Sequence, residues 1–167
     1  SISSSLKKKK LFHPASLPQR YQDFEEYHRI VKNTELDRET KVGLLDVPDY
    51  ENVEDFVKML FRLSKATKEI IVATHIFLNR FLSHTKWGMT ATTWRIFVII
   101  SLRLAQKYEG FPVLDSDELN FVYKLFSPQE FANLEFEFAE LANYEFYVSE
   151  KQYQSFALDL RTNAQCQ

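Results

Sequence analysis

The chain has 167 residues, a formal net charge of -2 and a sequence pI near 6.1. This length suits one domain with a sizeable core plus terminal segments, and it leaves little room for two domains. Aromatic residues make up 15% of the chain, while only three Gly and five Pro are present, which favours helices over a turn-rich β-sandwich or barrel. The charge balance lacks the basic excess of a nucleic-acid binder, so we expect no nucleic-acid partner.

The first third of the chain predicts peripheral segments. Residues 1–16 are rich in Ser and Lys, with four lysines at 7–10, and are expected to form a disordered basic tail. Residues 17–33 place apolar side chains at helical spacing, which predicts an outlying amphipathic N-terminal helix. Residues 34–51 carry charges, a Gly and a Pro, and predict a linker along the surface.

Five helices are expected to form a compact core between residues 52 and 148. Asn52 and Thr67 are plausible N-caps of the first two. The third, residues 94–108, is apolar around most of its circumference, so we expect it to be buried at the centre of the domain. Because crossing a bilayer takes about 20 apolar residues, we expect no integral membrane segment.

The remaining helices have polar start signals. These are Asp115 or Ser116, the capping box of Ser127 and Glu130, and the similar pair of Ser149 and Gln152. The last pair predicts a C-terminal helix within residues 149–167, followed by a short tail.

Glu135 is a carboxylate among the apolar positions of a core helix. Phe131 lies four residues before it and Phe138 three residues after it, so the three share one helix face. A carboxylate among aromatic rings costs free energy unless a donor or cation meets it. Lys107, at the end of the third helix, is the obvious cation. Either Glu135 points outward and Lys107 is simply solvated, or the two flank a partly apolar surface that receives a partner.

The sequence offers little for catalysis. Its glycines are isolated, so no phosphate-binding loop is predicted, and its four histidines lack metal-ligand spacing with each other or with Cys166. His75 is interpreted as a packed or edge histidine. We therefore expect no enzyme activity, metal, cofactor or small-molecule substrate. The single cysteine excludes an internal disulfide framework and favours a reducing, intracellular compartment, cytoplasmic and/or nuclear.

The segments around Lys107 and Glu135 resemble the cyclin box. Cyclins end their third helix with a small-residue and lysine motif, which LRLAQKYE, residues 102–109, matches at an alanine and at Lys107. Their fifth helix carries a hydrophobic-glutamate motif, which residues 133–153 match at a leucine and at Glu135. Two further segments are similar to the single-box cyclins of the Y and P/U type. They are TTWRIF at residues 92–97 and YEFYVSEKQYQSFALDLR at residues 144–161.

The resemblance implies an all-α fold in which residues 52–148 form a single five-helix cyclin box, with an additional N-terminal helix and a C-terminal helix. It also implies a function. The chain would be a regulatory subunit that binds and activates a cyclin-dependent protein kinase by holding the kinase C-helix in its active position. The alternative is a cyclin-fold scaffold or transcription-adaptor module that activates no kinase.

Carried over from the family, the kinase-binding residues are Lys107 and Glu135, with Ala139 and Tyr144 as apolar contacts of the same groove. The chain departs from the family at Gln106, where a serine or threonine is usual. If this assignment is right, reversing the charges of the lysine and the glutamate together abolishes kinase co-purification and leaves helicity intact.

Overall fold

The computed structural model describes residues 19–165, and all regular structure in this range is helical, with no strand. The predicted all-α class is therefore confirmed for these residues. In chain order the helices are α2 (Gln19–Gln22), α3 (Tyr27–Lys32), α4 (Arg38–Leu45), α5 (Tyr50–Leu63), α6 (Lys68–Thr85), α7 (Trp94–Tyr108), α8 (Ser116–Val122), α9 (Pro128–Leu141) and α10 (Glu150–Gln165). The predicted basic tail and Cys166 lie outside the described residues.

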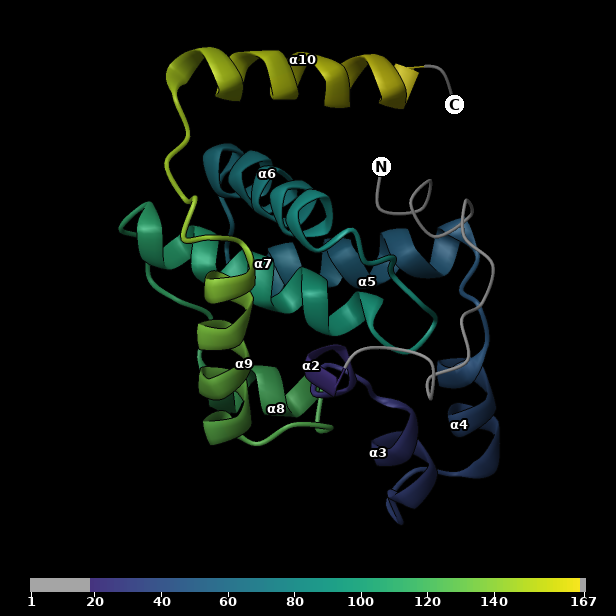
Figure 1. The fold of residues 1–167 in the computed structure, drawn as a ribbon. Coiled ribbons are helices and arrows are strands. Elements are labelled where there is room, and N and C mark those ends of the chain that lie inside the picture. The colour runs from purple at the N-terminus through teal and green to yellow at the C-terminus, as the bar shows by residue number, and fades with distance from the viewer. Residues whose placement is uncertain (1–18, 166–167) are drawn as a thin grey trace.

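Helix α7 is the central element, as its sequence predicts. Every residue from Trp94 to Gln106 is buried, because α6 packs along α7 and α9 crosses it. Figure 1 shows α6 and α7 in the middle of the bundle, with α10 above α6 and α9 running down from the end of α7. The helix ends where Gly110 adopts a φ of 73°, a left-handed conformation that glycine accepts at little cost.

Aromatic rings join the central helices into one core. The Phe81 ring of α6 stacks on Phe138 of α9, with 4.0 Å between the ring centroids, and packs edge-on against Phe97 of α7 at 4.9 Å. Phe24, from the segment after α2, packs against Phe97 at 5.3 Å. Burying a ring of this size stabilises a fold by about 2 to 3 kcal/mol.

The described part of the predicted N-terminal helix, residues 19–33, forms two short helices instead of one outlying helix, so the prediction of a single helix over residues 17–33 is wrong. The helix is interrupted between α2 and α3. There the Glu26 N–H donates to the Thr92 carbonyl at 2.9 Å, whereas in a continuous helix it would donate to a carbonyl of α2. The break lets Tyr21 and Phe24 enter the core, where they are 1% and 0% exposed. The N-terminal segment is therefore part of the core.

Residues 34–51 are more ordered than predicted. Asp37 starts α4 by accepting a hydrogen bond from the Thr40 N–H at 2.7 Å, so a linker without a helix is wrong. No residue of α4 is buried, which confirms the predicted position along the surface. Helix α5 begins earlier than predicted, because Asp49 rather than Asn52 is its N-cap.

The other predicted helix starts are confirmed. They are Thr67 for α6, Asp115 for α8, the capping box of Ser127 and Glu130 for α9, and the pair Ser149 and Gln152 for α10. Within residues 19–165, no helix combines the length and apolarity needed to cross a membrane.

Candidate partner-binding site

Glu135 is buried in α9 and held by two cations from α7. The residue is 4% exposed, and both Phe131 and Phe138 are fully buried beside it. One carboxylate oxygen accepts a hydrogen bond from Arg103 Nε and the other from Lys107 Nζ. The structure therefore brings the two predicted residues together, and the alternative that Glu135 points outward is wrong.

Arg103 is the member of this cluster that the sequence analysis missed. Its side chain is buried, and its Nη1 also donates to the Leu114 carbonyl at 2.6 Å. Arg103 lies one helical turn before Lys107, so spacing on the same helix face was the available signal. Arg103 thus joins α7, α9 and the segment before α8.

Lys107 connects the buried carboxylate to the surface. Its side chain is 44% exposed, whereas that of Glu135 is 5% exposed. Two cations meet one carboxylate, so the cluster carries one positive charge in excess, and Lys107 is the more exposed of the two cationic side chains, at 44% against 11% for Arg103. The hydrogen bond to Glu135 orients the Lys107 ammonium. An ammonium has three N–H donors, so this group can still donate to a partner.

Exposed aromatic residues lie on the elements that carry Lys107 and Glu135: Tyr108 follows Lys107, Phe136 follows Glu135, and Tyr144 is in the turn after α9. Tyr108 is 55% exposed, and its ring stacks on Phe146 at 4.4 Å between centroids, which brings the end of α7 beside the segment that follows α9. Tyr144 is 54% exposed and Phe136 is 64% exposed. We call Lys107, Tyr108, Phe136 and Tyr144 the lysine surface. Ala139, the fourth predicted contact, is buried behind it.

Tyr144 has an unusual backbone. It adopts a φ of 55° directly after Asn143, whose φ is 54°. For a bulky residue this left-handed conformation costs about 1 kcal/mol. Its N–H caps α9 by donating to the Ala139 carbonyl at 2.9 Å, so the ring is held at the surface by a fixed turn.

Gln106, which replaces the Ser or Thr usual in cyclins, has a structural role. It is 1% exposed, and its Oε1 accepts a hydrogen bond from the Leu114 N–H at 2.9 Å. Arg103 and Gln106 therefore both hold the backbone at Leu114, which fixes the segment that follows α7.

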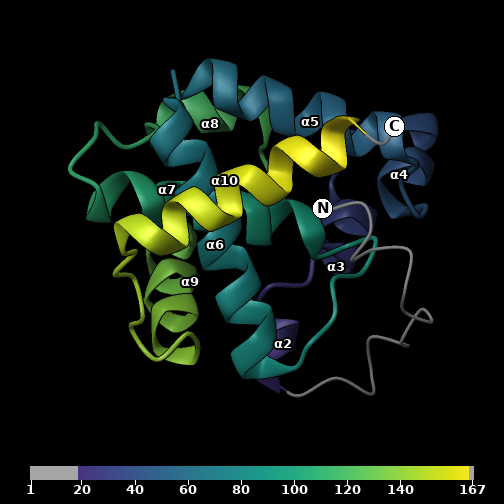
Figure 2. The same ribbon diagram turned by 90° about the horizontal axis from the view of Figure 1, so that it is seen from above.

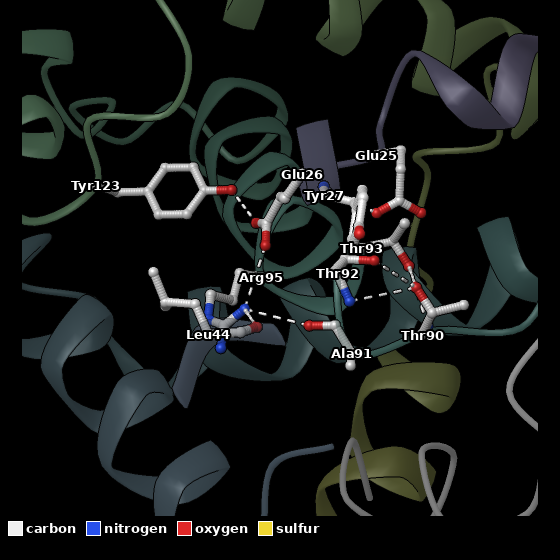
Figure 3. Close-up of polar contacts among 10 residues, drawn as sticks. All are labelled: Glu25, Glu26, Tyr27, Leu44, Thr90, Ala91, Thr92, Thr93, Arg95 and Tyr123. Atoms are coloured by element: carbon white, nitrogen blue, oxygen red, sulfur yellow. Dashed lines mark hydrogen bonds and ion pairs between the residues drawn. The ribbon is translucent and has the colours of Figure 1, made fainter. Parts of the chain in front are cut away.

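A second buried ion pair lies near the other end of α7 (Figure 3). The carboxylate of Glu26 is 3.2 Å from Arg95 Nη1 and accepts a hydrogen bond from the Tyr123 hydroxyl. Burial raises the pKa of Glu26 to about 7, although Arg95 and Tyr123 act in the opposite direction. Burial also raises the pKa of Tyr123, and the neighbouring carboxylate adds to this shift. Sequence reasoning did not single out this network, which is closed to solvent.

His75 is a packed histidine, as interpreted from the sequence. Its Nδ1 is 2.8 Å from the Ile71 carbonyl, and its ring lies between those of Phe61 and Phe156. Burial lowers its pKa. Across residues 19–165, no group of three or more His, Cys, Asp or Glu side chains could hold a metal ion.

The chain matches no protein-family model, and no solved structure matches it. The similarity to cyclins therefore depends on the motifs around Lys107 and Glu135. The geometry of those two residues gives the best guide to function.

Proposed function

We propose that the protein is a cyclin-type regulatory subunit that binds and activates a cyclin-dependent protein kinase through the lysine surface. In this proposal α5 to α9 are the five helices of a single cyclin box, and α10 is the additional C-terminal helix. One observation carries the proposal. A carboxylate buried among phenylalanine rings holds a lysine whose side chain is 44% exposed, on helices that also carry exposed aromatic residues.

The surface has the character of a protein interface. Tyr108, Phe136 and Tyr144 are exposed on α7, on α9 and in the turn after α9, and aromatic residues are enriched where proteins bind each other. Exposed apolar side chains that cluster in this way mark interaction sites more often than isolated ones do. Lys107 supplies a donor for carbonyl or carboxylate oxygens of the partner.

Glu135 acts as a positioning residue in this proposal. Each of its oxygens already accepts a hydrogen bond from a cation, and the side chain is only 5% exposed. The partner therefore meets Lys107 and the rings, while Glu135 fixes the lysine. This assignment differs from the family-based expectation, in which the glutamate itself contacts the kinase.

The mechanism is a shift of a conformational equilibrium in the kinase. A protein kinase is active only when its conserved lysine pairs with the C-helix glutamate. A partner that binds the inward C-helix more tightly than the outward one shifts the population toward the active state. Moving the ratio from 1:99 to 99:1 takes about a 10⁴-fold difference in affinity. A surface fixed by α7, Arg103 and Gln106 loses little conformational freedom on binding, which favours such affinity.

The test uses recombinant cyclin-dependent kinases, added one at a time to the purified chain. The wild type is expected to bind one or more of them and to raise phosphorylation of a substrate peptide. Lys107→Glu is expected to abolish both effects. Lys124→Glu is the matched control, because it makes the same charge change at an exposed lysine outside the lysine surface.

The outcomes separate the two functional readings. A kinase that binds without a rate increase favours the scaffold or adaptor alternative. Failure of every kinase to bind, or equal activation by Lys107→Glu and the wild type, contradicts the proposal. Reversing Glu135 as well is uninformative, since a lysine there would face Arg103 in a buried site and lower stability.

A further inference from the structure

A groove of about 750 Å³ lies between α6 and α10, and neither Lys107 nor Glu135 lines it. Figure 2 shows α10 crossing over α6 on this side of the molecule. Two apolar side chains line the groove, Ile76 from α6 and Phe156 from α10, and both are at least partly buried. The rest of its lining is polar or charged.

The groove is anchored by Arg80. Its Nη1 donates to the carbonyls of Glu145 and Tyr147, at 2.9 and 2.7 Å, and its Nη2 is 3.4 Å from the Gln152 side chain. These bonds tie the segment before α10 to α6. The groove therefore exists before any partner binds, so its walls need little reorganisation.

The charges in the groove favour an anion. Arg80 and Lys151 are both cationic, whereas Glu145 is the one acid in the lining, and its carboxylate already pairs with His84 Nε2 at 2.9 Å. The Arg80 donors are used on the backbone and on Gln152, but its charge remains. No described residue makes an ion pair or hydrogen bond with the Lys151 side chain. Lys151 thus lines the groove as a cation without a partner among residues 19–165.

Three polar side chains of the groove make no hydrogen bond within the described part of the chain. The side chains of Asn79, Ser83 and Ser155 line the groove, and among residues 19–165 none of them has a hydrogen-bond partner for its polar atoms. All three residues are exposed. They offer donors beside the positive charges, which suits carboxylate and carbonyl oxygens of an occupant.

We propose that the groove binds an extended acidic peptide segment of a partner protein. One apolar side chain of the peptide packs against Ile76 and Phe156, and its carboxylates face Lys151 and Arg80. Small-molecule sites are mostly apolar and enclose the ligand, whereas this groove is lined mainly by exposed polar residues. The site goes beyond the proposed function, because neither Lys107 nor Tyr144 takes part in it.

The experiment measures fluorescence anisotropy of a labelled peptide with a central leucine flanked by Asp and Glu residues, titrated with the full chain. A peptide with lysines in place of the acids is the control ligand. The wild type is expected to bind only the acidic peptide, and more weakly as salt rises. Lys151→Glu is expected to weaken binding about tenfold. Ser83→Trp, which fills the groove from an exposed position, is expected to abolish it.

Two control variants make the result specific. Lys124→Glu and Lys107→Glu change the same charge elsewhere and are expected to leave the peptide affinity unchanged, so this test is independent of kinase activation. The proposal is overturned if either control weakens binding as much as Lys151→Glu does. Equal binding of the acidic and basic peptides, or no binding at all, overturns it as well. Circular dichroism of each variant verifies that the helices remain.

Discussion

Two of the buried carboxylates among residues 19–165, those of Glu26 and Glu135, are each held by an arginine of α7. Glu26 and Arg95 form a pair with the Tyr123 hydroxyl, and all three residues are buried, with Glu26 0% exposed. Glu135 pairs with the buried Arg103 but also with Lys107, which reaches the surface. The first network joins segments of the fold. The second network also includes a partly exposed lysine that a partner could contact.

The difference in enclosure has an energetic consequence. Removing one partner from a closed ion pair leaves a buried charge with no access to water, which costs several kcal/mol. In the open cluster the remaining groups can still reach each other or solvent. The two networks are therefore expected to respond very differently to the same kind of substitution.

The largest effect is expected for Arg95→Met. This change removes the guanidinium that meets Glu26 and donates to the Leu44 and Ala91 carbonyls, and it is expected to lower the free energy of unfolding by about 3 to 5 kcal/mol. Urea denaturation followed by circular dichroism measures the loss. Arg38→Met, at an exposed position of α4, is the control and is expected to change stability by no more than about 0.5 kcal/mol. Equal effects of the two variants would show that the closed pair does not stabilise the fold.

Arg103→Met is expected to cost less, about 2 to 3 kcal/mol. Lys107 still meets the Glu135 carboxylate in this variant, although the Leu114 carbonyl loses its donor. The same denaturation experiment gives the comparison. A loss as large as that of Arg95→Met would remove the contrast between the open and the closed network.

A pH titration sharpens the comparison further. In the folded state the pKa of Glu26 is about 7, whereas its ordinary value is 4.5. Between these values the folded state holds a proton that the unfolded chain releases, so the contribution of Glu26 to stability is full below pH 4.5 and is lost as pH rises to about 7.

Glu26→Gln removes this titration. The difference in free energy of unfolding between wild type and variant is therefore expected to shift against the wild type from pH 4.5 to 7 and then to level off. Urea midpoints at several pH values measure it. A difference that stays constant over this range would contradict the raised pKa.

The smallest effect on stability is expected for Lys107→Ala. Its side chain is nearly half exposed, and Arg103 keeps Glu135 paired, so the free energy of unfolding is expected to fall by no more than about 1 kcal/mol. Kinase binding is nevertheless expected to be lost. A large loss of stability in thermal unfolding would instead place Lys107 with the structural network.

The sequence predicted the helices whose ends are coded locally. Apolar residues fill nearly the whole of 94–108, and the hydroxyl of Ser127 with the carboxylate of Glu130 makes a capping box, so both helix starts follow from neighbours along the chain. Helix α4 was not predicted because residues 34–51 are mostly polar. Asp37, which caps this helix by accepting from the Thr40 N–H, is a residue type typical of N-caps and was the available signal. Patterns of local spacing thus gave most of the core.

Contacts made by tertiary structure were harder to predict. The break before α3 depends on a hydrogen bond from Glu26 to Thr92, far along the chain, and no Gly or Pro marks it. Glu26 looks like a surface acid because it follows Glu25 in a polar stretch. In the candidate site, Lys107 and Glu135 were found because a carboxylate among phenylalanines needs a cation. Arg103, one turn before Lys107 on the same face of α7, was the second cation that the same argument could have found.

The central claim is tested most directly by the affinity between the chain and a cyclin-dependent kinase that it activates. Isothermal titration calorimetry of that kinase with wild type, Lys107→Glu and Lys124→Glu gives the three dissociation constants under one condition. The account predicts that Lys107→Glu binds at least about 30-fold more weakly than the wild type, and that Lys124→Glu binds equally well. Equal affinities for all three proteins would contradict it.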